Sequence, residues 1–183
     1  SQPVVEQIEM AGLLHDIGKI EADYLELLRK PGPLSAAERG VIESHVTKGE
    51  EFLRNLSSVP EPVIQAVRHH HEREDGCGYP DNLLGDEIPL GAKIIVVSDA
   101  VDAMLSDRPY RQALPLPVVR EELRAQAGKQ FDHRVIRALM TSGLLTDYAE
   151  IMPLGREVTE IVAKRQLLDP RPWPAPRKRS QVE

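Results

Sequence analysis

The side chains that could do chemistry in this sequence are histidines and carboxylates, which fall in separate blocks beside apolar runs. One block is Leu13-Leu14-His15-Asp16, a second runs from His69 to Asp75, and a third lies around Asp99. Five of the six histidines lie in or near these blocks, namely His15, His45, His69, His70 and His71. A helical protein assembles a metal cluster in this way, with one or two ligands from each of several elements. The clustering favours metal-dependent chemistry over a purely structural domain.

His15 and Asp16 are adjacent, so on a helix their side chains would point about 100° apart. Side chains placed in this way can straddle a metal pair, with one on each ion. Lys19 follows His15 by four residues, which on a helix puts its ammonium on the same face and into the same cavity. The alternative is a helix-terminal histidine that only stabilises the helix dipole.

The triplet His69-His70-His71 presents its imidazoles in three directions, so we expect at most two of them to face one cavity. The alternative is a polar helix end exposed to solvent, and the following Glu72, Arg73 and Glu74 read equally well as a solvated charge run. His45, taken alone, is typical of a surface or a satisfied core histidine.

Asp99 lies in an otherwise apolar run, where a carboxylate is costly unless it is paired or bound to metal. Asp102 follows one turn later and suits a capping or supporting role better than direct ligation. Because the set holds no thiolate, a metal with mixed nitrogen and oxygen ligands fits, such as Mn²⁺, Fe²⁺ or Zn²⁺.

Arg108 and Arg111 flank Pro109-Tyr110 directly after the Asp99 run. Two guanidinium groups at this spacing suit a bidentate phosphate clamp. Surface salt bridges are the alternative.

The elements that would position these residues read as helices. Apolar spacing predicts a helix over 4–14, and a capping box of Ser35 and Glu38 predicts another, which runs to about Leu56 and carries His45. A helix after Pro60 delivers the histidine triplet, and a loop rich in Gly, Pro, Asp and Asn follows over 75–89. Further helices are predicted over 90–105, 118–127, 134–145 and, more weakly, 157–168, with Gly128 as a stop. The run 94–97 could instead be a buried parallel strand, but no second run of that kind exists, so we predict an all-α fold.

The composition of the chain limits the classes of protein to which it can belong. The chain has 183 residues, 41% of them hydrophobic, and a net charge of −6, which argues against a nucleic-acid or membrane-surface binder. Cys77 is the only cysteine, so an internal disulfide is impossible. No apolar run approaches the roughly 20 residues that span a bilayer, and no signal peptide opens the chain, so we expect a cytoplasmic protein. The abrupt start without methionine predicts a fragment.

We expect three parts along the chain. Residues 1–145 form the main domain, 146–168 an accessory C-terminal helix, and 169–183 an extended tail rich in Pro and Arg. The tail is expected to be peripheral, with a basic docking segment as the alternative.

Taken together, the blocks resemble the HD-GYP family, a branch of the HD phosphohydrolase superfamily. The resemblance covers roughly residues 8–140 and rests on many ordered motifs. They include Leu14-His15-Asp16-Ile17-Gly18-Lys19, Ser44-His45, His70-His71-Glu72-Arg73, Asp75-Gly76-Cys77-Gly78-Tyr79-Pro80, Ser98-Asp99, Asp102-Ala103 and Ser106-Asp107-Arg108-Pro109-Tyr110-Arg111.

The resemblance implies an all-α bundle with a metal site in its centre that hydrolyses the bacterial second messenger cyclic di-GMP to pGpG, and onward to GMP, in signal transduction. It implies two or three divalent ions, Fe or Mn, with His15, Asp16, His45, His70, His71 and Asp99 as ligands. Asp16 and Lys19 would be catalytic, and Lys19, Arg108 and Arg111 would contact the substrate phosphates. The Gly78-Tyr79-Pro80 loop would border the site and contact diguanylate-cyclase domains, and an upstream regulatory domain is expected.

The sequence departs from the family pattern in three places. A further histidine, and in some members a glutamate, normally lies on a helix before the one that ends at His15-Asp16, and nothing here supplies them. Glu74 replaces a common aromatic residue, and Cys77 occupies a variable loop position. A cyclic dinucleotide receptor with an incomplete metal set, and an HD hydrolase for another phosphoester, are the competing functions.

Overall fold

The computed structural model describes residues 1–20, 24, 26–27, 30, 32–107 and 111–151. Its α-helices are α1 (Gln2–Leu14), α3 (Ala36–Glu43), α4 (His45–Arg54), α5 (Glu61–His69), α6 (Leu90–Leu105), α7 (Leu116–Ala125) and α8 (His133–Ser142). Short 3-10 helices η1 (Ile17–Ile20) and η2 (Gly85–Glu87) lie between them, and 144–151 is also helical. These described residues hold two isolated β-bridges and no strand. The all-α prediction is confirmed, and the strand alternative for 94–97 is wrong because that run lies inside α6.

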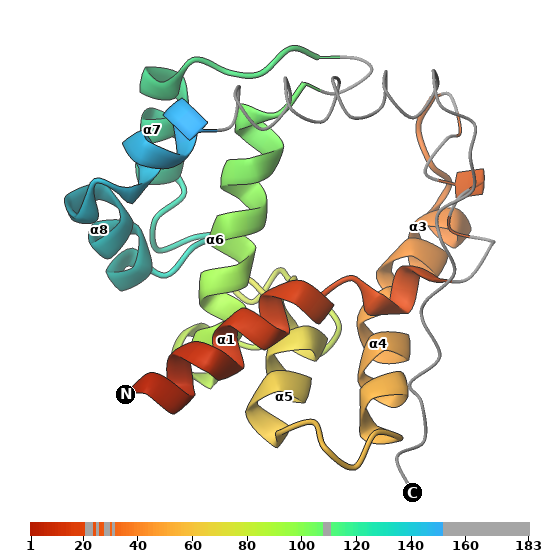
Figure 1. Cartoon of the computed structure of the whole chain (residues 1–183). Coiled ribbons are helices and arrows are strands. Elements are labelled where there is room, and N and C mark those ends of the chain that lie inside the picture. The colour runs from red at the N-terminus through yellow and green to blue at the C-terminus, as the bar shows by residue number, and fades with distance from the viewer. Residues whose placement is uncertain (21–23, 25, 28–29, 31, 108–110, 152–183) are drawn as a thin grey trace, which may run out of the picture.

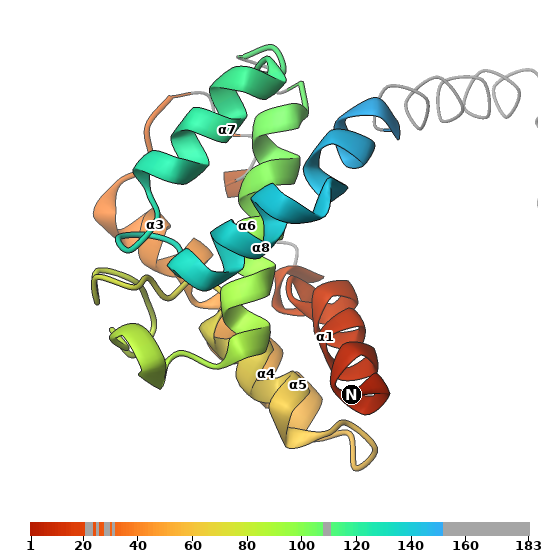
Figure 2. The same ribbon diagram turned by 90° about the vertical axis from the view of Figure 1, so that its left-hand side faces the viewer.

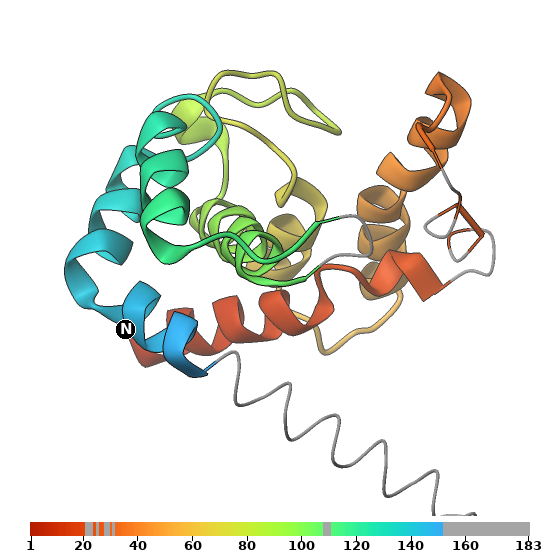
Figure 3. The same cartoon turned by 90° about the horizontal axis from the view of Figure 1, so that it is seen from above.

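Helix α6 is the central element, with α7 and α8 along one part of it and α1, α4 and α5 at the other (Figure 1). Seen from above, it stands near the middle of the surrounding helices (Figure 3). Its residues serve two hydrophobic cores. Val97, Val101 and Leu105, spaced by four, pack with α7 and α8, whereas Ile95 joins the core formed with α1 and α5. On this side α1 and α5 pack against α6, and α4 packs against α5 (Figure 2).

The capping box predicted at Ser35 is present, because its side chain accepts from the Glu38 amide and Glu38 accepts from the Ser35 amide. The single helix predicted to run on to about Leu56 is wrong, since it divides at Ser44 into α3 and α4. The Ser44 hydroxyl donates to the carbonyl of Val41, a local bond that competes with the helical ladder.

The C-terminal elements also end differently from the prediction. Helix α8 stops at Ser142, because Gly143 takes a left-handed conformation with φ of 80°. The predicted helix over 157–168 and the tail over 169–183 lie outside the described residues, and the three-part division stays a prediction. Within the described part of the chain, no helix is both long and apolar enough to cross a membrane.

Gly18 lets η1 approach α4 closely. A Cβ atom on Gly18 would collide with the backbone oxygen of His45 and lie 2.7 Å from the Gly49 nitrogen. By contrast, a Cβ on Gly12, in α1, would meet nothing within 4 Å. The absence of a side chain at Gly18 therefore sets the distance between the His15-Asp16 segment and His45.

Replacing Gly18 with alanine should lower the free energy of unfolding by about 1–3 kcal/mol, because rigid backbone must move. The matched control Gly12→Ala should leave it unchanged or raise it by up to about 1 kcal/mol, since alanine favours helix. Urea denaturation of both variants measures the difference. Equal effects of the two substitutions would contradict the close approach.

Candidate metal centre

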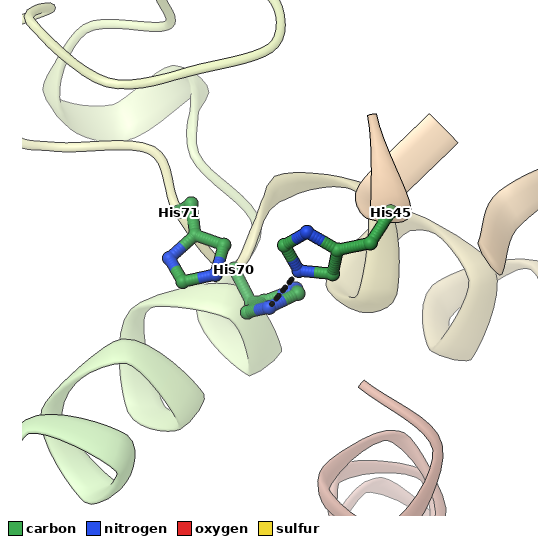
Figure 4. Close-up of side chains that lie close together, drawn as sticks. All are labelled: His45, His70 and His71. Atoms are coloured by element: carbon green, nitrogen blue, oxygen red, sulfur yellow. Dashed lines mark hydrogen bonds between the residues drawn. The ribbon is translucent and has the colours of Figure 1, made fainter. Parts of the chain in front are cut away.

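Three helix junctions bring the predicted ligands together. His15 and Asp16 follow the end of α1, His45 begins α4, and His70 and His71 follow α5. Figure 4 shows the imidazoles of His45, His70 and His71 turned toward one another. Ligand atoms of these three residues lie within 4.8 Å of one another, and so do those of a second group, His15, Asp16 and His70.

Three of the imidazoles are oriented in the same way. The Nδ1 atoms of His15, His45 and His70 each lie 2.7 Å from the carbonyl oxygen three residues earlier, those of Gly12, Ile42 and Val67. A carbonyl only accepts, so each Nδ1 carries a proton, and in a neutral ring the Nε2 then carries a lone pair. This bond to the non-ligating nitrogen is the arrangement that fixes histidine ligands around metals.

The Nε2 atoms of His45 and His70 face each other with no proton between them. His45 Nε2 and His70 Nε2 are 3.3 Å apart, the contact dashed in Figure 4. With both Nδ1 atoms protonated, neutral rings leave no hydrogen for this contact. Both side chains are fully buried, so the two acceptors face each other out of reach of solvent. A cation between them would satisfy both.

Burial keeps these rings uncharged. Burial lowers the pKa of His70 to about 2 and that of His71 to about 3, with the neighbouring imidazoles as the second cause. Burial also lowers the pKa of His45. At neutral pH the nitrogens are therefore available as ligands.

Asp16 provides the negative charge of the cluster. Burial opposes its ionisation, but the neighbouring Lys19 ammonium outweighs this and the pKa of Asp16 is lowered. Lys19 Nζ lies 2.7 Å from Asp16 Oδ1 and forms an ion pair with it. Oδ1 also lies 3.4 Å from His45 Nε2 and 3.9 Å from His70 Nε2. Neutral imidazoles around an ionised carboxylate fit a divalent metal, and this cluster could hold one or more such ions.

Lys19 reaches the cluster by a route other than the predicted one. The shared helical face with His15 is wrong, because α1 ends at Leu14 and Lys19 lies in the 3-10 helix η1. That tighter turn points its ammonium at Asp16.

The expectation that at most two histidines of the triplet face one cavity is confirmed. His70 and His71 join the cluster, whereas the ring of His69 contacts the Gln65 carbonyl and Asp81 Oδ2, both at 2.9 Å. The Gly78-Tyr79-Pro80 loop borders the cluster, since the ring of Tyr79 stacks on His71 with centroids 4.8 Å apart.

Other predicted site residues are not brought into the cluster. Asp99 is exposed on α6 and belongs to neither group of ligand atoms found among the described residues. Its charge, with those of Glu43 and Asp16, adds to the effect of burial in raising the pKa of Tyr79. Asp102 accepts a hydrogen bond from Tyr148 at 2.8 Å.

Of the two arginines in the predicted phosphate clamp, the structure describes only Arg111. The Arg111 guanidinium donates to the carbonyl of Ala103 at 2.7 Å, near the end of α6. Arg108 lies outside the described residues, so the clamp stays a prediction.

Reading residues 72–74 as a solvated run is wrong for Glu72. Its carboxylate is 1% exposed and accepts from the amides of Asp81 and Leu83 at 2.7 and 3.1 Å. Glu74 pairs at 2.8 Å with Lys93, a buried lysine on α6 that sequence reasoning missed. A lysine inside the apolar run 90–105 was the available signal.

Comparison with known proteins agrees with this geometry. The HD domain family matches residues 1–135. The chain is 44% identical over 142 residues to the cyclic di-GMP phosphodiesterase response regulator RpfG of Xanthomonas campestris pv. campestris, covering 76% of this chain and 37% of that protein. It is 38% identical over 144 residues to a cyclic di-GMP phosphodiesterase of Thermotoga maritima, with coverage of 76% and 38%. It is 35% identical over 136 residues to the 3'3'-cGAMP-specific phosphodiesterase 2 of Vibrio cholerae, with coverage of 74% and 26%.

The chain therefore belongs to the HD domain family and, with the motifs quoted above, to its HD-GYP branch. It spans between 26% and 38% of the length of these three relatives.

The buried neutral histidines predict that the metal-free chain loses stability in mild acid. In the unfolded chain His70 takes up a proton below its ordinary pKa of 6.5, whereas the folded chain does not until about 2. The unfolded state thus binds more protons, and stability falls as the pH falls through this window. His70 alone should contribute a loss of about 2 kcal/mol between pH 6.5 and 5, at about 1.4 kcal/mol per pH unit.

Urea denaturation with a chelator present, repeated across this pH range, measures the slope. His70→Gln should flatten it, while His133→Gln, which changes an exposed histidine, should not. A slope that is the same in all three proteins would contradict the burial argument.

Proposed function

We propose that this domain hydrolyses cyclic dinucleotides, with cyclic di-GMP as the first candidate, to the linear dinucleotide pGpG and onward to GMP. The observation that carries the proposal is the convergence of uncharged imidazole nitrogens on a carboxylate oxygen of Asp16, with the Lys19 ammonium paired to it. The names of the relatives, which specify cyclic di-GMP or 3'3'-cGAMP, support this substrate class. They also favour an enzyme over a receptor that has lost its metals.

In this proposal His15, Asp16, His45, His70 and His71 bind two or three divalent ions, and Asp99 completes the set. Iron or manganese suits these nitrogen and oxygen donors. When bound, such ions would supply an acidified water and neutralise the charge of the phosphodiester. The Nδ1–carbonyl bonds hold the imidazoles in place so that no reorganisation is needed during the reaction.

Lys19 and the arginines would act on the substrate itself. The Lys19 ammonium lies beside Asp16. It can also attract a phosphate oxygen of the substrate as negative charge develops there in the transition state. To bind the substrate, Arg111 would have to give up its hydrogen bond to the Ala103 carbonyl and donate to a phosphate oxygen instead. Arg108 would bind the same phosphate. Contact with diguanylate-cyclase domains through the Gly78-Tyr79-Pro80 loop, and an attached regulatory domain, belong to the same proposal and rest on the family resemblance.

The proposal predicts that Asp16→Asn loses metal and activity together. The amide keeps the shape of the carboxylate but not its charge, so turnover should fall by at least about 100-fold. The assay incubates the chain anaerobically with cyclic di-GMP in Mn²⁺ or Fe²⁺, resolves products by chromatography and measures bound metal. The control Glu121→Gln makes the same chemical change on α7, where the side chain is 79% exposed.

Two results would count against the proposal. Full turnover in Asp16→Asn would remove the role of Asp16. A metal-loaded wild-type chain that cleaves neither cyclic di-GMP nor 3'3'-cGAMP would point to another phosphoester, which a substrate panel would identify.

A further inference from the structure

His71 differs from the other imidazoles of the cluster in how it is held. His15, His45 and His70 are each fixed by a backbone carbonyl, but among the described residues the His71 ring has only ring contacts. It stacks on Tyr79 at an interplanar angle of 26° and lies 4.1 Å, centroid to centroid, from His70. The backbone adds a second link, since the Tyr79 amide donates to the His71 carbonyl at 3.3 Å. The orientation of the His71 ring therefore depends on where Tyr79 lies.

Tyr79 is in turn held by a polar clamp just after it, centred on Asp81. The Asp81 carboxylate accepts two hydrogen bonds from Arg68, both at 2.8 Å, and lies 2.9 Å from His69 Nε2. Its own amide donates to the buried carboxylate of Glu72. Arg68 is fixed on its other side by Glu50 of α4.

The same stretch of chain carries both the clamp and the ligands. Arg68 and His69, in the last turn of α5, hold Asp81, while the next two residues, His70 and His71, enter the cluster. Gly78 closes the loop tightly, because a Cβ there would lie 2.5 Å from the Glu72 Cα. The clamp and the stacked ring thus move with the ligands as one unit.

We propose that Asp81 is a positioning residue, which through Arg68 and His69 seats Tyr79 on His71 and so fixes the imidazole of the cluster that no carbonyl holds in the described part of the chain. This inference rests on the proposed metal centre and extends it to a residue that contacts neither metal nor substrate. It assigns the Gly78-Tyr79-Pro80 loop an internal role, as the support of a ligand.

The test measures Mn²⁺ binding to the full chain by calorimetry, with no substrate present. Asp81→Ala and Tyr79→Ala should each weaken Mn²⁺ binding by about 10-fold or more, the usual effect of removing a support behind a ligand. Tyr79→Phe keeps the stacked ring and should bind as wild type. Pulsed EPR of the bound Mn²⁺ should count one imidazole fewer in the two alanine variants.

The matched control is Glu61→Ala, which removes a bidentate partner of Arg54 at 2.9 and 3.0 Å, also between α5 and α4 but away from the loop. The double variant Asp81→Ala with Tyr79→Ala should be no weaker than either single variant, because both act through one ring. Should Asp81→Ala fail to fold, Arg68→Gln removes the same contact from the other side.

Wild-type affinity and a full imidazole count in Asp81→Ala, or additive losses in the double variant, would overturn the positioning role. Because binding is measured without substrate, an inactive wild-type chain that shows the expected pattern would overturn the proposed function and still support this inference.

Discussion

The site depends on one recurring bond, in which a histidine Nδ1 donates to the carbonyl three residues earlier. Carbonyls in the last turn of a helix lack the amide partner that the ladder would supply, so they are well placed to accept this bond. His15 follows the end of α1, His70 follows α5, and His45 uses the carbonyl of Ile42 near the end of α3. Three helix ends must therefore meet at one point. The division of the chain at Ser44 places one of these ends at the start of α4, where His45 reaches the Ile42 carbonyl.

The same arrangement opposes stability. The folded chain buries the imidazole acceptors of His45 and His70, which face one another. Such groups each cost about 1–3 kcal/mol when left unsatisfied. The surrounding helices offset this through the apolar core that α1 and α5 share with the first turns of α6. A packed core that holds unsatisfied acceptors in place is what a cation site requires, since the cation then meets ligands that are already oriented.

Local features of the sequence predicted much of this structure, and long-range features did not. The capping box at Ser35 and the helix over 90–105 depend on neighbours within a few residues, and both are present. Helix geometry limited the triplet to two imidazoles in one cavity, and the family resemblance indicated that these are His70 and His71. Lys93 and Asp132 are 39 residues apart in the sequence, so no local pattern predicts that they pair. The buried role of Glu72 was hidden for the same reason, because its partners are amides of a loop whose path the sequence does not specify.

The loop over 72–89 joins the two halves of the molecule. On one side Asp81 is held by α5, which belongs to the core containing α1 and the histidine cluster. On the other side Glu74 meets Lys93, which is 2.9 Å from Asp132, the residue that caps α8 in the second core. The Asp75 amide also donates to the Lys129 carbonyl. Charged contacts that are largely shielded from water therefore tie this one loop to both cores.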